Sequence, residues 1–452
     1  MTLTLPAPRH YLAEGRLQWL RRLTRAAPLL PALATVLLLA APVSGGDAAA
    51  SGKVTPADAA SALLVLTCAV RLLRARRPVL SATAAVVLGA PVAGFAVATA
   101  TSLDPAGSVT GFLRYVQVFV LVPAAVVLSL RDRRDFGVVA GSVVALALFQ
   151  GGVGVWQYAT GTGASYMGED IRAVGTFGPA DVMDMATVVA YGLVIAVAYA
   201  LTPAAGRAPW VRPAALACAV ALLVPLTVSF SRGTWIATAA ACTAMIVLAG
   251  RARAVRVFAV LAACATLLVG GFGVGSDLIS ERVASISRVT DSPDHSVIDR
   301  YTLWAAALSM WREHPATGVG LKRFPAERDA HASLALSSAS DTAGAGHAFA
   351  REPLLSPHNM YLLALSEQGL LGCALLTGSW AALLTAATAR LVRTRRARGP
   401  GGAVGLAAVG LLLWTCVDFL YADIGGPSTV LTATVLGLAA WWALNPSPEH
   451  TR

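Results

Sequence analysis

Charged residues are scarce in this chain of 452 residues. Asp, Glu, Lys and Arg together make up 13% of it, whereas apolar residues make up 56%. So low a charge content excludes an ordinary soluble globular domain. The apolar residues recur in runs of about 20, the length that crosses a hydrocarbon core of about 30 Å. The sequence therefore predicts an all-α polytopic membrane protein.

Metal-binding patterns are also lacking. The six cysteines all fall inside apolar runs and show no Cys-x-x-Cys spacing, which predicts small core residues and excludes a disulfide framework or a zinc site. Five of the seven histidines gather between residues 295 and 358, but their spacing matches no metal-ligand motif, and no Asp-x-Asp motif is present. We expect neither a metal ion nor a cofactor.

Twelve apolar runs are long enough to be membrane spans. Their predicted bounds are 27–44, 55–72, 79–101, 112–130, 136–158, 182–202, 213–230, 233–250, 255–275, 358–389, 402–422 and 427–445.

Arginine predicts the orientation of these spans, because short loops rich in basic residues stay on the cytoplasmic side. With the N-terminus inside, the cytoplasmic segments hold 23 of the 35 basic residues and only four acidic ones. The net charge of +11 is therefore a topology signal, and a nucleic-acid partner is unnecessary. The predicted order is a cytoplasmic segment 1–26, nine spans within 27–275, an extracytoplasmic loop 276–357, three spans within 358–445 and a cytoplasmic tail 446–452.

The large outer loop contains one predicted helix. Ser296 to Asp299 resembles a capping box, and Pro315 cannot continue a helix that runs to about Glu313. Helical spacing predicts that one apolar face rests on the bundle or the membrane surface, which leaves Arg300 facing a neighbouring cleft. An interfacial amphipathic helix with a solvated arginine is the alternative. The predicted face consists of Ile298, Tyr301, Ala305, Leu308 and Trp311.

His358 lies where this loop re-enters an apolar helix. It follows Pro357, and the helical pattern begins at Asn359, so the imidazole is expected at a helix N-terminus that faces outward. The positive end of a helix disfavours imidazolium and keeps the ring neutral, as a general base requires. Taken alone, His358 is equally well explained as a capping or interfacial histidine.

Three further residues of the same helix attract attention. Glu367 lies about one turn into the membrane, where a carboxylate is costly unless it is paired, and Arg300 or Arg232 are candidate partners. Gly369 and Gly372 are spaced for close approach of another helix.

His358-Asn359, nine residues, then Gly369-x-x-Gly372 resembles the His-[Asn/Ser/Gln]-x9-Gly-x-x-Gly signature of O-antigen ligases, a family related to the Wzy-type polysaccharide polymerases. Other segments are similar to that family in the same order along the chain. They are 172–177, with a departure at 178–181 where many relatives carry Asn-Pro-Asn, then 231–235, Arg300-x3-Trp304, and 314–324.

The resemblance implies an inverting, metal-independent glycosyltransferase of GT-C-like architecture. It would move a glycan from an undecaprenyl-pyrophosphate carrier to an acceptor hydroxyl of a glycan or glycolipid on the outer face of the cell membrane. His358 would be the general base. Arginine suits the pyrophosphate because its planar fork donates two hydrogen bonds to one group. The expected clamp is Arg232, Arg300 and Arg172, with Asn359, Glu367, Gly369, Gly372 and Trp304 in support.

A secondary transporter of a polar or lipid-linked envelope precursor is the main alternative, because many carriers also have twelve spans. Carriers usually join two six-span halves by a cytoplasmic loop, whereas the long loop here is predicted outside, between spans nine and ten. The sequence does not separate a ligase from a polymerase.

Overall fold

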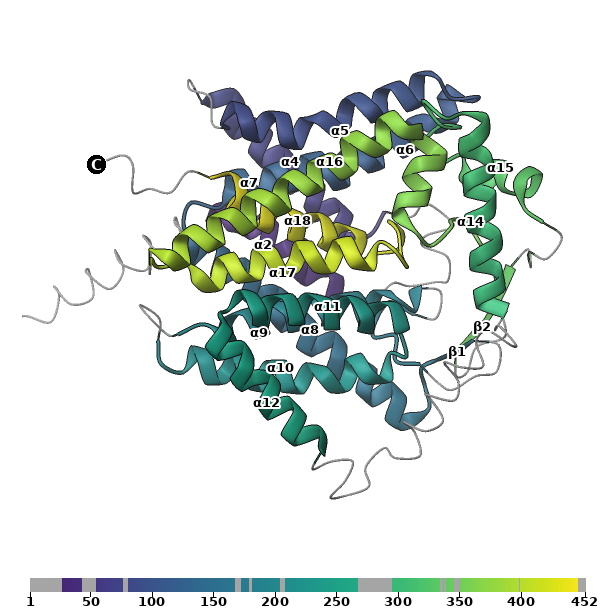
Figure 1. The fold of residues 1–452 in the computed structure, drawn as a ribbon. Coiled ribbons are helices and arrows are strands. Elements are labelled where there is room, and N and C mark those ends of the chain that lie inside the picture. The colour runs from purple at the N-terminus through teal and green to yellow at the C-terminus, as the bar shows by residue number, and fades with distance from the viewer. Residues whose placement is uncertain are drawn as a thin grey trace, which may run out of the picture.

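The structure is a computed structural model that describes residues 27–42, 54–75, 80–166, 172–178, 181–203, 208–266, 295–333, 336, 339–344, 350–397 and 399–445. Long helices lie side by side, and α14 runs across one end of them (Figure 1). The predicted terminal segments 1–26 and 446–452 lie outside the described residues.

The first half of the chain contributes the elements from η1 to α10. Their bounds are η1 Ala27–Leu29, α2 Leu30–Leu37, η2 Leu38–Ala40, α4 Pro56–Arg74, α5 Ala82–Ala100, α6 Pro105–Val116, η3 Gln117–Leu121, α7 Val122–Ser129, α8 Arg133–Thr160, β1 Ala164–Tyr166, α9 Asp184–Leu201 and α10 Val211–Val228.

The second half contributes the elements from α11 to α18. Their bounds are α11 Arg232–Leu248, α12 Arg251–Thr266, α14 His295–Glu313, α15 Phe324–His331, β2 Ala339–Gly344, β3 Ala350–Pro353, α16 Met360–Arg396, α17 Gly402–Asp418 and α18 Thr429–Leu444.

Seven helical segments of the described chain are long and apolar enough to cross a membrane. Four shorter apolar segments accompany them, namely 27–40, 232–248, 402–418 and 429–444. The seven are Pro56–Arg74, Ala82–Ala100, Pro105–Ser129, Arg133–Thr160, Asp184–Leu201, Val211–Val228 and Met360–Arg396. The chain is thus a helical protein with several candidate spans, and the count of twelve stays a prediction.

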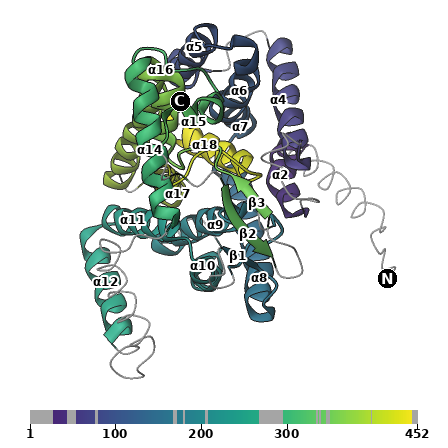
Figure 2. The same ribbon diagram turned by 90° about the vertical axis from the view of Figure 1, so that its right-hand side faces the viewer.

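A small three-stranded sheet accompanies the helices. The strand order is β1-β2-β3 and both pairings are antiparallel, with Ala164 opposite Gly344 and Ala339 opposite Pro353. Figure 2 faces the end of the bundle where these strands and α14 lie. Ala, Ser and Gly dominate β1 and β2, and such residues have weak strand preference, so the sequence carried no strand signal. β1 lies between the predicted spans 136–158 and 182–202, and β2 and β3 lie in the predicted outer loop 276–357. The sheet thus joins two segments that the sequence predicts outside.

Arginine side chains tie helix ends together at the other end of the bundle. Arg390 donates through Nη1 to the carbonyl oxygens of Trp442 and Asn445, each at 2.5 Å. Arg133 donates to Pro400 O, and Arg395 donates to Ala249 O. Cations at helix C-termini pair with carbonyl groups that have no partner within the helix. These segments are ones that the sequence predicts as cytoplasmic, and the orientation itself stays a prediction.

The longest helix, α16, is interrupted at Gly369. Its φ of 62° and ψ of −168° are non-helical. The amides of Leu370 and Leu371 would normally bond to Ser366 and Glu367. They bond instead to Pro315 O at 2.8 Å and Ala316 O at 3.1 Å. Lipid offers no hydrogen bonds, so an interrupted helix needs protein partners.

The turn at 315–320 also satisfies the carbonyl groups that this interruption releases. Val319 N–H donates to Ser366 O at 2.9 Å, and Gly320 N–H donates to Glu367 O at 3.0 Å. The turn therefore replaces two intrahelical hydrogen bonds with four bonds to the outer segment. The predicted close approach of a neighbouring helix occurs at Gly372, where a Cβ added to Gly94 of α5 would lie 2.7 Å from Gly372 Cα.

We predict that Gly369→Ala destabilises the protein by about 1–3 kcal/mol, because this backbone region is accessible essentially to glycine alone. The added Cβ would also collide with the backbone of Ala316 and Thr317. Thermal unfolding in detergent measures the effect. Gly378→Ala is the matched control, since it lies in the same helix and its Cβ would meet nothing within 4 Å. Equal melting temperatures for the two variants would contradict the prediction.

Candidate active site

His358 directly precedes α16 in a strained backbone conformation. Asn359 is the N-cap, and its Oδ1 accepts hydrogen bonds from the amides of Tyr361 and Leu362, both at 3.0 Å. The φ of His358 is 48°. A positive φ is uncommon for a side chain of this size and costs about 1–3 kcal/mol, and such residues cluster at functional sites. Asn359 therefore supplies the cap, which leaves the His358 imidazole available for another role.

The loop at 419–428, between α17 and α18, holds the start of α16. Met360 N–H donates to Phe419 O at 2.9 Å and to Ala422 O at 3.0 Å. Asn359 donates through Nδ2 to Leu420 O at 3.1 Å. Unpaired amides at a helix N-terminus need acceptors, and this loop provides them. Two segments about 60 residues apart in the sequence are thereby fixed against each other.

Asp423 in this loop is a site residue that the sequence reasoning missed. It interacts electrostatically with His358, and it accepts hydrogen bonds from the Ser356 side chain and the His358 amide. Its Oδ2 is buried and has no hydrogen-bond partner in the described chain. The available signal was an acidic residue in a short loop between two apolar spans, on the side predicted for His358.

Burial sets the pKa values of both members of this pair. It lowers the pKa of His358 from 6.5, Arg300 lowers it further, and the carboxylate of Asp423 opposes both effects. Burial raises the pKa of Asp423, against the stabilising effects of His358, Ser356 and Arg300. A lowered pKa keeps the imidazole neutral near pH 7, the state that accepts a proton.

Arg300 and Trp304 belong to α14, which lies beside His358. The charge of Arg300 acts on both His358 and Asp423. Trp304 lies about one turn further along and donates through Nε1 to Pro357 O at 2.8 Å. The structure thus brings together Arg300, Trp304 and His358, and their roles stay predictions.

The helix bounds predicted for α14 are nearly right, since it ends at Glu313. The face that packs on the bundle is not the predicted apolar one, and contact of that apolar face with the membrane surface stays a prediction. Tyr301 is 64% exposed and lies edge-to-face against Trp304, at 5.6 Å between ring centroids. The helix packs on α16. Small and flexible side chains fit that interface, and the larger aromatic Tyr301 faces outward. The residues actually buried are Asp299, Thr302, Leu303, Ala306, Ala307 and Met310.

Glu367 does not have the partners that the sequence suggested. The side chain is 2% exposed. Its Oε1 accepts the Phe324 amide at 3.1 Å, and its Oε2 accepts the Tyr115 hydroxyl at 3.3 Å. A backbone amide and a neutral hydroxyl satisfy this carboxyl in place of an arginine. Glu367 thus holds the turn before α15 against α16 and α6.

Arg232 is the first residue of α11, beside the same 419–428 loop. A Cβ added to Gly233 would lie 2.9 Å from Tyr421 Cβ, so the start of α11 approaches the segment that carries Asp423. The Arg232 side chain is exposed. The residue before Ser231, Phe230, has a positive φ of 50°, a second strained position at this end of the bundle.

Arg172 lies in a segment tied to α8 and α10. Its backbone pairs with Ala164, and Ala173 N–H donates to Val228 O at 3.1 Å, just before the turn that leads to Arg232. Gln157 of α8 accepts the amides of Val174 and Gly175 through Oε1. These contacts bring Arg172 to the Arg232 side of the site, whereas the charge that acts on His358 belongs to Arg300.

Residues 216–377 match the model of the O-Antigen ligase family, which confirms the predicted resemblance over that segment. The segment begins in α10, ends in α16 and includes Arg232, Arg300 and His358. No curated protein matches the chain.

We predict opposite shifts of the His358 pKa from two substitutions. Asp423→Asn removes a negative charge that raises the pKa and should lower it further. Arg300→Gln removes a positive charge that lowers the pKa and should raise it. Histidine ¹⁵N chemical shifts, followed against pH in nanodiscs, report both shifts once His358→Gln has assigned the signal. Arg312→Gln, on the exposed side of α14, is the control, and shifts of the same sign from Asp423→Asn and Arg300→Gln would contradict the assignment.

Proposed function

Starting from the match of residues 216–377 to the O-Antigen ligase family, we propose that the protein is a membrane glycosyltransferase. It moves a glycan from an undecaprenyl-pyrophosphate carrier to an acceptor hydroxyl on the outer face of the cell membrane. The observation that carries the proposal is the grouping of His358, Asp423 and Arg300 where α14, α16 and the 419–428 loop meet.

His358 acts as the general base. The acceptor oxygen attacks the anomeric carbon, and the imidazole takes the hydroxyl proton as the new bond forms. The bond from that carbon to the pyrophosphate oxygen breaks, and the pyrophosphate leaves with the electron pair. Attack opposite the leaving group inverts the anomeric centre. A buried site with a lowered His358 pKa supports this role.

Asp423 orients the imidazole and stabilises its protonated form. The carboxylate already accepts from Ser356 and the His358 amide, and its unpaired Oδ2 remains as a further acceptor. A carboxylate beside a histidine favours the imidazolium that forms once the proton has moved. The pair therefore combines a neutral base before transfer with a stabilised cation afterwards.

Arginines neutralise the leaving group. Arg300 lies beside His358, and Arg232 begins α11 close to the loop that carries Asp423. A guanidinium donates two hydrogen bonds to one phosphate, and a helix N-terminus also favours an anion. Arg172 would contribute from the adjoining segment. Because these cations neutralise the charge that develops on the leaving group, the proposed reaction needs no metal ion.

The family match favours glycan transfer over the alternative of a secondary transporter. The acceptor is a hydroxyl of an envelope glycolipid in a ligase, or of a second lipid-linked repeat in a polymerase. Both reactions use the same base and the same clamp. The proposed topology has both termini in the cytoplasm.

We predict that His358→Ala lowers transfer by about 10²–10⁴-fold, the usual contribution of a general base. Membranes with matched expression, supplied with lipid-linked glycan and acceptor, measure the rate. His331→Ala is the control, because its ring contacts Ser309 on α14 instead of the site. Full activity of the His358→Ala variant would overturn the base assignment.

We also predict that Arg300→Lys lowers transfer by at least about tenfold, since lysine keeps the charge but loses the two-pronged hydrogen bonding. A higher KM for the lipid-linked donor, with the acceptor KM unchanged, would locate the defect at the pyrophosphate. Arg312→Lys, on the same helix, should retain activity. If Arg300→Lys matched the wild type, a bidentate phosphate contact would be excluded.

A further inference from the structure

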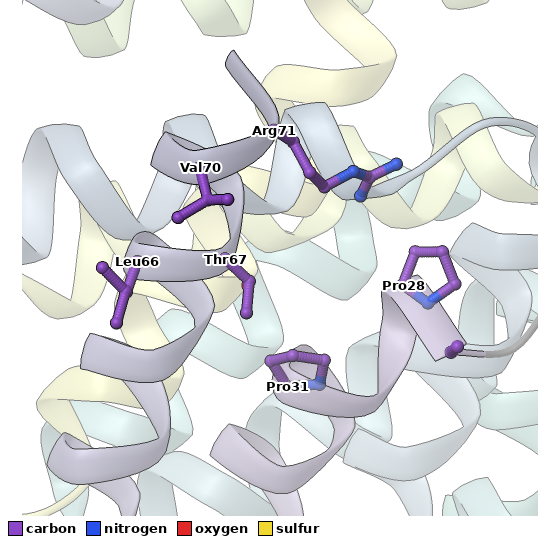
Figure 3. A pocket seen from close by; sticks show the side chains of 7 residues that line it. Pro28, Pro31, Leu66, Thr67, Val70 and Arg71 are labelled. Carbon is purple, nitrogen blue, oxygen red and sulfur yellow. The ribbon is translucent and has the colours of Figure 1, made fainter. Parts of the chain in front are cut away.

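A cavity of about 460 Å³ lies between α2 and α4. Figure 3 shows side chains of α4 along one wall and the rings of Pro28 of η1 and Pro31 of α2 along the other. Its size falls in the range of about 300–1,000 Å³ that is usual for small-ligand sites. Its lining is apolar except for a threonine and one arginine: Ala27, Pro28, Pro31, Leu66, Thr67, Val70 and Arg71.

Arg71 also lines a second cavity, of about 200 Å³, on its other side. That cavity is again mainly apolar, and its lining includes Leu72 and Leu128. No hydrogen bond or ion pair of Arg71 with another residue is found in the described chain, and its side chain is exposed. One cation therefore stands between two apolar cavities.

The two cavities lie far from the candidate active site, at the opposite end of α4 and α7. The continuous helical segment Pro105–Ser129, which ends in α7, runs in the same direction as α4. Asp58 pairs with Arg114 of α6 at 2.6 Å near one end, and Cys68 donates to Ala125 O of α7 at 3.3 Å further along. Tyr115, next to Arg114, reaches Glu367 on the candidate-site side. Arg71 thus lies near the C-terminal end of α7, at the end of the bundle where Arg390, Arg133 and Arg395 donate to carbonyl oxygens.

We propose that this is a binding site for an anionic phospholipid of the membrane leaflet opposite the candidate active site. The phosphate pairs with Arg71, and the two acyl chains occupy the two cavities. Charge complementarity selects an anionic headgroup over a zwitterionic one, and basic pockets between transmembrane helices are suited to such lipids. The apolar linings require a ligand with hydrocarbon chains, so inorganic phosphate lacks most of the contacts. The site is independent of the proposed transferase.

The test compares lipids on the intact protein. In native mass spectrometry from detergent, phosphatidylglycerol should remain bound to the wild type in preference to phosphatidylcholine, whereas inorganic phosphate should add no adduct. Arg71→Gln should lower the phosphatidylglycerol-bound fraction by about fivefold, which corresponds to the about 1 kcal/mol that one arginine contributes to anionic-lipid binding. Arg74→Gln is the matched control, because Arg74 is exposed on the same turn but lines neither cavity.

A cavity-filling variant distinguishes lipid binding in the cavities from nonspecific electrostatic attraction to Arg71. Val70→Trp fills the larger cavity while it keeps Arg71, and it should lower binding of phosphatidylglycerol as well. Leu63→Trp, on the exposed face of α4, should not. Equal retention of both lipids by the wild type, or equal losses in Arg71→Gln and Arg74→Gln, would overturn the proposal. So would full retention in Val70→Trp, and so would binding of inorganic phosphate alone.

Discussion

The interruption of α16 is the constraint on which the candidate site depends. A helix that opens inside a membrane leaves amides and carbonyls that lipid cannot satisfy. The turn at 315–320 supplies the missing partners to four of these groups, and Glu367 adds a fifth bond through the Phe324 amide. This turn is continuous with α14 through His314, so α14 is fixed relative to α16. These hydrogen bonds, at residues 366–371 of α16, therefore help to fix the helix that carries Arg300.

Strain is concentrated where these elements meet. In the described chain, the non-glycine residues with a positive φ are Phe230, Lys322 and His358. They lie before α11, in the turn held by Glu367, and before α16. Each conformation costs about 1–3 kcal/mol and persists only where surrounding contacts determine the backbone. The capping by Asn359 and the double acceptor for Met360 are such contacts, and they fix the backbone that follows His358.

Sequence reasoning succeeds here where the signal is local. Pro315 and the capping pattern predicted a helix that ends at Glu313, and Pro357 with Asn359 predicted a helix start behind His358. It fails where the answer depends on which loops meet. In the sequence, Asp423 is one acidic residue among several, and only the packing of the 419–428 loop against the start of α16 places it beside His358. The buried face of α14 is set by the shape of α16. The partners of Glu367 are a backbone amide and a tyrosine hydroxyl from two distant segments.

Arginine fulfils two different roles that composition does not distinguish. At one end of the bundle, Arg390, Arg133 and Arg395 donate to carbonyl oxygens at helix ends. These pairings join each guanidinium to neutral backbone acceptors. At the other end, Arg300 acts on a histidine and a carboxylate that can exchange a proton. A net charge of +11 describes both ends equally. The neighbours of each guanidinium make the difference. Carbonyl groups give the arginine a structural role, whereas a titratable pair gives Arg300 neighbours whose charge depends on pH.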